Sequence, residues 1–333
     1  MKKLKASIKN REFTGVYLFY GEEEYLKTRY ETELINALVP EEARMMNLDI
    51  FEEKRISADG IIEVLKAPPF LSESRVVIVR DSGFFKSGKK EDSERIAGFL
   101  SELPPEAHLI FNEKEVDKRA RAFKAAEKAG RAVEFKTPGE KDLMKWVALE
   151  LSKSKVKIAP ETAAYFLRSI GGDMETAVRE MEKLAAFKGE GGAVLEGDID
   201  AVCVKALETR IFDLVGTMGR GELKKALTIY RNLIMTKEPP MRVLAMVTRQ
   251  IRLIYQCKTL SREGVSLSEA AARLGQREFV VRECMRQAGS FSEETLRRAL
   301  EDCLDADMSI KTGRMKDELA VELLIVKYSG NTC

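Results

Sequence analysis

The segment with the clearest chemical pattern runs from Gly21 to Thr28, after a short apolar run and at the start of a helical pattern. Gly21, Lys27 and Thr28 stand at fixed positions of the phosphate-binding pattern G-x-x-x-x-G-K-[ST]. In such a loop, backbone amides and the lysine hold nucleotide phosphates, and the hydroxyl binds Mg²⁺. Nucleotide binding is therefore the chemistry that these residues could perform.

Several positions indicate that this nucleotide site no longer works. Leu26 replaces the second glycine, whose missing side chain lets the backbone wrap around phosphates, and the glutamates at 22–24 would repel them. Arg80 and Asp81 stand where an ATPase carries its magnesium-binding acidic pair, and Glu175 stands where a G-D-x-R stretch would supply an arginine. We expect a fold retained without ATP hydrolysis. An accidental match to the loop pattern stays open as the alternative.

The elements that would position this loop alternate between strand and helix patterns over the first 139 residues. This alternation predicts a doubly wound parallel sheet with helices on both faces, ending at the breaker Thr137-Pro138-Gly139. Strands are predicted at 16–20, 47–51, 76–79, 108–112 and 132–135, and helices at 24–38, 57–65, 91–103 and 117–128.

The pattern of the remaining residues, from 140 onward, predicts helices. Residues 140–208 predict a small helical unit with helices at 142–152, 160–170 and 174–187, and residues 209–333 predict a helical bundle. Pro239-Pro240 separates two amphipathic helices of this bundle, at a position where proline is tolerated as a helix start. Their apolar faces comprise Leu223, Ala226, Leu227, Tyr230, Leu233 and Ile234, and Val243, Leu244, Val247, Ile251, Ile254 and Tyr255.

The charge balance and the lengths of the apolar runs argue against a generally DNA-binding, a secreted or a membrane-spanning protein. The 333 residues carry 56 basic and 54 acidic side chains, a net charge of +2, so any DNA contact must come from a local patch. No apolar run is long enough for a signal peptide or a spanning helix, so we expect a cytoplasmic protein without a membrane partner.

Cysteine and histidine usage favours neither metal nor acid–base chemistry. The five cysteines form no C-x-x-C pair, which argues against structural zinc and favours reduced thiols in the core. The single histidine, His108, stands inside a predicted strand and is expected to be structural. We therefore expect no catalytic site, no metal site and no cofactor.

Motifs spread along the chain carry a resemblance to a known family. They are the Tyr17-Leu18-Phe19-Tyr20-Gly21 run with its following acidic residues, Pro69-Phe70-Leu71 leading into Arg75-Val76-Val77-Ile78-Val79, Gly172-Asp173 with Glu182-Lys183-Leu184, Arg249-Gln250-Ile251-Arg252-Leu253, and the stretch from Asp307 to Gly313. In this order and spacing, they resemble the delta subunit of the bacterial DNA polymerase III clamp loader.

This resemblance implies an architecture and a set of partners. It implies an AAA+-like clamp-binding domain with a degenerate phosphate loop at 1–139, a small helical lid-like domain at 140–208, and a helical collar that oligomerises at 209–333. The implied partners are the sliding clamp (beta subunit), the gamma/tau ATPase subunits and delta-prime in a five-membered ring, and primed DNA. The implied function is to open the clamp for loading during replication, as a component of the DNA polymerase III holoenzyme.

The same resemblance assigns clamp binding to Pro68, Pro69, Phe70 and Leu71. The predicted helix must end before the prolines, so Phe70 and Leu71 would lie on a stiff loop that loses little entropy on docking. From the residues alone, these two side chains could equally fill the local core. The two prolines depart from the polar-plus-leucine wedge of some relatives, so the residue that makes the deepest contact stays open.

Two alternative functions belong to other classes. An ATPase would use Lys27 and Thr28, and a helix-turn-helix regulator would use the segment 265–275 and the helix after it. That next helix is substantially apolar at Phe279, Val280, Val281 and Met285, which suits burial better than base reading. Possible DNA or subunit contacts are Arg242, Arg249, Arg252, Lys258, Lys311, Arg314 and Lys316.

Overall fold

The computed structural model describes residues 2–52 and 57–330. Its chain divides into two compact units, Met1–Pro138 and Gly139–Cys333, and each is described by itself. The three-domain division predicted from the sequence, with boundaries at 139 and 208, stays a prediction.

The first unit is built on a parallel five-stranded sheet. Its strands are β1 (Val16–Tyr20), β2 (Leu48–Glu52), β3 (Arg75–Arg80), β4 (Ala107–Glu113) and β5 (Gly130–Glu134), in the order β2-β3-β4-β1-β5. The central strands β1 and β4 are buried along their whole length, as expected for a parallel sheet covered on both faces. This arrangement confirms the predicted doubly wound, AAA+-like α/β fold.

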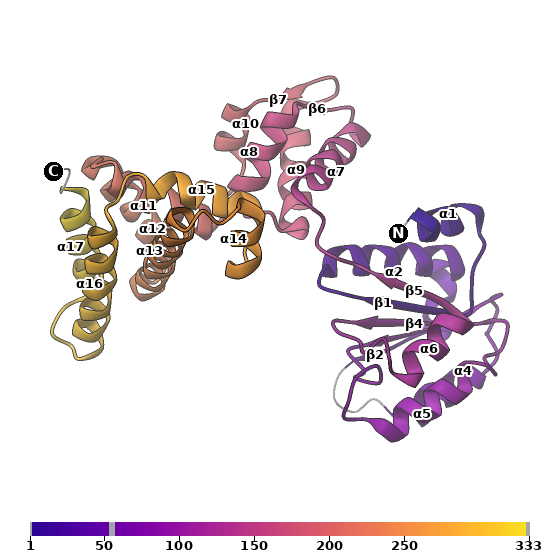
Figure 1. Ribbon diagram of the computed structural model, residues 1–333. Coiled ribbons are helices and arrows are strands. Elements are labelled where there is room, and N and C mark those ends of the chain that lie inside the picture. The colour runs from indigo at the N-terminus through magenta and orange to yellow at the C-terminus, as the bar shows by residue number, and fades with distance from the viewer. Residues whose placement is uncertain (1, 53–56, 331–333) are drawn as a thin grey trace. The chain divides into compact units, whose positions relative to one another are not determined.

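Helices cover both faces of this sheet (Figure 1). One face carries α1 (Lys2–Asn10) and α2 (Glu24–Leu38), and the other carries α4 (Ala58–Lys66), α5 (Lys90–Phe99) and α6 (Arg121–Ala129). The short η1 (Glu41–Ala43) and α3 (Arg44–Asn47) lead into β2. Alternate strand residues, including Leu18, Val77 and Phe111, share one apolar cluster with Ile61, Ile96 and Phe123 of the covering helices.

Two predicted helices of this unit were too long. The helix predicted over 91–103 ends at Phe99, where the chain forms a turn in which the backbone N–H of Glu102 donates to the Phe99 carbonyl at 2.8 Å. The helix predicted over 117–128 begins only at Arg121, because the Asp117 carboxylate accepts the backbone N–H of Arg119 at 2.9 Å and forms a local turn instead.

The second unit begins with a small group of helices. It contains α7 (Glu140–Lys153), α8 (Pro160–Ser169), α9 (Met174–Lys188) and α10 (Glu196–Val202). A two-stranded parallel pair, β6 (Lys157–Ile158) and β7 (Ala193–Val194), joins the loops between them. The sequence did not predict this pair, because two residues are too few to show a period.

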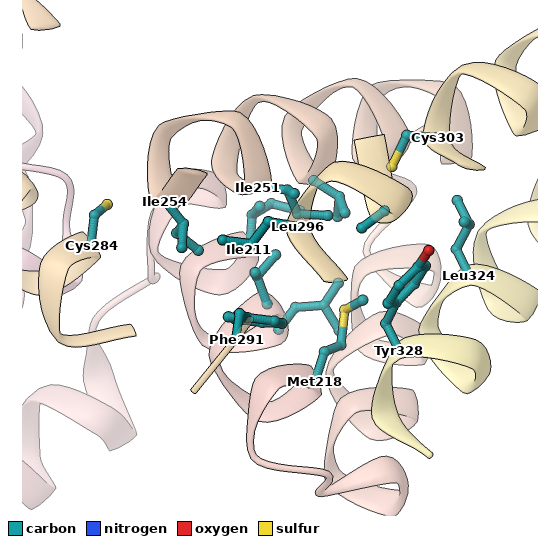
Figure 2. Packing of buried hydrophobic residues seen from close by; sticks show 14 of the residues in the cluster. Ile211, Met218, Ile251, Ile254, Cys284, Phe291, Leu296, Cys303, Leu324 and Tyr328 are labelled. Atoms are coloured by element: carbon teal, nitrogen blue, oxygen red, sulfur yellow. The ribbon is translucent and has the colours of Figure 1, made fainter. Parts of the chain in front are cut away.

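The rest of the second unit is a helical bundle with its own core. Its helices are α11 (Leu207–Gly219), α12 (Leu223–Met235), α13 (Pro240–Arg262), α14 (Leu267–Leu274), α15 (Glu278–Ala288), α16 (Glu293–Lys311) and α17 (Asp317–Ser329). Pro240 stands at the start of α13, as predicted. Figure 2 shows part of the core, where Ile211, Ile251 and Leu296 come from three different helices. Among the described residues, no helix combines the length and the apolar character that crossing a membrane requires.

Candidate functional site

The loop between α4 and β3 presents two apolar side chains to solvent. Helix α4 ends at Lys66, and Pro68 and Pro69 prevent its continuation. Phe70 is 55% exposed and Leu71 is 88% exposed, so neither fills the core. Leu71 has φ of 50°, a left-handed backbone that a residue with a side chain adopts only when its surroundings hold it there.

The buried side chain of Asn47 fixes the backbone of this loop. Its Oδ1 accepts the backbone N–H of Phe70 at 2.6 Å, and its Nδ2 donates to the Phe70 carbonyl at 2.8 Å and to the Ala43 carbonyl at 2.9 Å. Phe70 thus has an anchored backbone and an exposed ring. No local pattern in the sequence marks Asn47, because its partner is 23 residues away.

The residues beside Asn47 add further exposed apolar surface. Met45 is 92% exposed and Met46 is 54% exposed, both on the four-residue helix α3. The sequence analysis did not single them out, because two adjacent methionines carry no period of their own. The first unit therefore has one region where a rigid backbone presents large apolar side chains to water.

The lysine of the phosphate-loop pattern is fully buried. Its Nζ lies 3.0 Å from the Glu24 carboxylate and 3.0 Å from the Glu113 carbonyl oxygen. Leu26, in place of the second glycine, is buried too. Lys27 thus braces the start of α2 against the end of β4, and a phosphate would have to displace both partners.

The backbone of the same loop is also occupied. The amide of Gly21 donates to the Glu113 carbonyl at 3.2 Å, and the amide of Glu23 donates to the Phe135 carbonyl at 3.1 Å. Gly21 has φ of 117°, and a Cβ there would lie 2.4 Å from that same Phe135 oxygen. Amides that would cradle a phosphate instead fasten the loop to neighbouring strands.

An arginine takes the region where an ATPase would place magnesium ligands. Arg80, at the end of β3, forms ion pairs with Glu31 of α2 and Glu52 of β2. The side-chain Nδ2 of Asn112 donates to the same buried Glu31 carboxylate at 3.2 Å. Asp81, the other residue at this position, pairs with Lys114 at 3.3 Å. These carboxylates already have protein cations as partners.

The neighbouring carboxyl group, Glu113, supports the next loop. It accepts the backbone N–H of Ser82 at 2.9 Å and that of Gly83 at 3.4 Å, and it also bonds the Ser82 hydroxyl. Burial raises the pKa of Glu113, which these hydrogen bonds oppose. Glu113 thus serves the packing of the strand ends.

A shallow cleft of about 510 Å³ lies beside the loop. Its walls carry four glutamates and two lysines, Glu22, Glu24, Glu115, Glu134, Lys114 and Lys118. One of these lysines, Lys118, already pairs with Glu134 at 3.1 Å. The excess of negative charge opposes binding of a polyphosphate. Glu175, in the first turn of α9, belongs to the second unit and pairs with Arg179 at 3.5 Å.

Most basic residues singled out in the bundle have local partners. Arg242 pairs with Glu238 at 3.4 Å, Lys311 pairs with Asp307 at 2.7 Å, and Arg314 donates to the Thr312 hydroxyl at 3.0 Å. Lys258 donates to the Ala288 carbonyl at 2.9 Å and so joins α13 to α15. Arg249, Arg252 and Lys316 are exposed, and a DNA or subunit contact through any of these residues stays a prediction.

The helix pair that suggested a DNA-reading motif has its apolar face in the bundle. Ser266 caps α14, and Gly275 ends it with a left-handed backbone. On α15, Val281 and Cys284 are fully buried, and Phe279 and Val280 are half-buried. The predicted burial of this helix is confirmed.

The cysteines and the histidine also lie where the sequence placed them. Cys203, Cys257, Cys284 and Cys303 are buried free thiols, and Cys333 lies outside the described residues. Among the described residues, no cluster of histidine, cysteine, aspartate or glutamate could hold a metal ion. His108 is buried in β4, where its Nδ1 donates to the Thr14 carbonyl at 3.0 Å.

Comparisons with known proteins agree with this architecture. A model of the family "DNA polymerase III, delta subunit" matches residues 17–136, and one described as "DNA polymerase III delta subunit, C-terminal domain" matches residues 208–328. The DNA polymerase III subunit delta of Bacillus subtilis is 28% identical over 331 residues, which cover 96% of this chain and 94% of that protein. The solved structure of the Bacillus subtilis DNA clamp loader delta protein has a TM-score of 0.75 and 26% identity, and the match covers 98% of this chain and 99% of that chain.

Proposed function

The chain belongs to the family of DNA polymerase III delta subunits, and on that premise we propose that it binds the sliding clamp through Phe70 and Leu71 and opens the clamp ring without hydrolysing ATP itself. It is a clamp loader delta subunit. In this proposal, the loop 68–71 is the clamp-binding element of the first unit, and the helical bundle joins the other loader subunits.

The observation that carries the proposal is a rigid loop with exposed apolar tips. Two prolines and the buried Asn47 amide hold the backbone, while Phe70 and Leu71 face water. Large apolar groups on a preorganised backbone gain from burial and lose little conformational entropy on binding. An apolar pocket on a clamp is the kind of surface that such a loop fits.

The proposal is tested by measuring clamp affinity of the wild type and of the Phe70→Ala/Leu71→Ala variant. Burying these side chains contributes about 3 kcal/mol, so the variant should bind ~100-fold more weakly. The matched control is Phe187→Ala/Leu195→Ala, which truncates two exposed apolar side chains of the second unit and should bind like the wild type. No clamp binding by a folded wild-type chain would refute the proposed function.

The proposal also includes a nucleotide site that does not bind ATP. It is supported by the buried Lys27, by the occupied amides of Gly21 and Glu23, and by the acidic walls of the neighbouring cleft. Titration of the isolated chain with Mg-ATP should give no saturable heat and no change in thermal unfolding. A saturable signal that disappears in Lys27→Ala would instead support the ATPase alternative.

The remaining partners follow from the same premise. A clamp loader subunit acts within a complex, and we assign the bundle of the second unit to contacts with the ATPase and delta-prime subunits of a five-membered ring. In that ring, primed DNA would be a shared partner. Arg249 and Arg252, two of the exposed basic residues of α13, are the ones that we assign to a DNA or subunit contact.

A further inference from the structure

Exposed apolar side chains of the first unit are concentrated in one region. Among its described residues, the exposed large hydrophobic side chains are Met45, Met46, Ile50, Phe70 and Leu71. They belong to two segments, 45–50 and 70–71, that lie 20 residues apart in the sequence. A concentration of apolar groups on an otherwise charged surface marks an interaction site.

Hydrogen bonds join these two segments. Asn47 directly follows Met46, and its side chain bonds both the N–H and the carbonyl of Phe70, at 2.6 and 2.8 Å. Since neighbouring Cα atoms are about 3.8 Å apart, the backbone of the two methionines lies close to that of Phe70. The methionines and the loop therefore form one connected region, which we call the α3–loop surface (Met45, Met46, Phe70 and Leu71).

We propose that the clamp-binding surface extends beyond the loop onto α3, and that Met45 and Met46 contact the sliding clamp alongside Phe70 and Leu71. This inference rests on the proposed function. Methionine suits a secondary contact, because its unbranched, polarisable side chain adapts to the shape of the opposing surface.

The charges around this surface agree with a docking role. Glu41, Glu42 and Glu73 are exposed and flank the two segments in the sequence. Protein interfaces commonly have an apolar centre and a polar rim, and this pattern fits one. The clamp is favoured as occupant because the α3–loop surface is continuous with the loop assigned to it.

The first test measures clamp affinity of Met45→Ala/Met46→Ala. We expect binding about 5- to 30-fold weaker than wild type, mostly through faster dissociation. The matched control is Met235→Ala, an 80% exposed methionine of the second unit, which should leave affinity unchanged. Full affinity in the double methionine variant, together with loss of binding in Phe70→Ala/Leu71→Ala, would overturn this inference and leave the proposed function intact.

A second test needs no substitution. Peroxide oxidises exposed methionines to sulfoxides, and the rate at each position is read by mass spectrometry. Saturating clamp should slow oxidation of Met45 and Met46 several-fold, while Met235 keeps its rate. If saturating clamp left the oxidation rates of Met45 and Met46 unchanged, as it should that of Met235, the inference would be overturned. Self-association that is lost in the methionine variant, with clamp affinity unchanged, would overturn it in favour of a contact between copies.

Discussion

At the residue scale, Lys27 keeps its position in the phosphate-loop motif but has protein groups as its partners. The sequence identified the degenerate loop from Leu26 and the neighbouring glutamates. The structure adds a different cause, because the ammonium group is fully buried and bonds a carbonyl of β4. A phosphate would have to displace both partners of this side chain, which supports the proposal that the loop does not bind ATP. The role of Asn47, in contrast, could not be predicted from the sequence, because it depends on Phe70, a partner that only the fold brings near.

His108 gives a prediction about charge at a buried position. Burial lowers the pKa of its imidazole below the ordinary value of 6.5, while the hydrogen bond to the Thr14 carbonyl opposes this shift. Since the chain has a single histidine, its Cε1 proton should titrate in the NMR spectrum with a midpoint below 6.5. A midpoint at or above 6.5 would contradict the structural role assigned to this residue.

The same pKa sets the sign of a stability change. As pH falls below 6.5, the unfolded chain takes up a proton that folded His108 resists, so the free energy of unfolding should decrease. The change is complete once pH lies below the folded-state pKa. Denaturant unfolding of the wild type and of His108→Gln, at neutral pH and at pH 5.5, separates this contribution from that of the carboxyl groups.

At the element scale, the predicted bounds were right where the sequence signals agree and wrong where a local interaction competes with them. Strand β1 and helix α2 have the bounds that the sequence predicted, because apolar period and turn residues agree there. The start of α6 was misplaced because Asp117 offers the backbone a competing turn. The loop after α4 was predicted from its prolines, yet its exposure followed only from the structure.

This loop carries a prediction about Asn47. Asn47→Ala removes three hydrogen bonds and leaves the N–H and carbonyl of Phe70 without their side-chain partner, which should cost about 2–4 kcal/mol of stability. The freed loop should also bind the clamp ~10-fold more weakly, because it must be ordered on binding. Chemical denaturation and clamp titration at a temperature where the variant is folded measure the two effects separately.

Asn36→Ala provides the matched control for this variant. Its side-chain Oδ1 accepts a hydrogen bond at 2.6 Å from Arg44, which is on the same short helix as Asn47, but Asn36 lies at an exposed site. Its loss should therefore cost less than ~1 kcal/mol and leave clamp binding unchanged. If Asn47→Ala lost stability but kept full clamp affinity, the loop would be ordered by its prolines alone.

At the scale of the whole molecule, each of the two units has an apolar cluster of its own. One cluster involves the sheet of the first unit, including Leu18, Val77 and Phe111, and another fills the bundle around Ile211, Ile251 and Leu296. The sequence predicted this contrast between a sheet-based core and a helical core, because strand and helix patterns alternate only over the first 139 residues. The resemblance to a family predicted the clamp loader function, which neither composition nor period could do, because the proposed clamp contact consists of a few exposed side chains.

The division into two units leads to a prediction about fragments. Strand β5 ends at Glu134 and α7 begins at Glu140, so a cut between Pro138 and Gly139 breaks no helix or strand. Fragments 1–138 and 139–333 should each unfold cooperatively, because each retains its own apolar core. Fragment 1–138 should bind the clamp with an affinity within about threefold of that of the full chain, since the α3–loop surface lies wholly inside it.

Fragment 139–333 should bind loader subunits but not the clamp. Fragment 1–138 with Phe70→Ala/Leu71→Ala is the control, and a folded 1–138 that cannot bind the clamp would place part of the contact in the second unit.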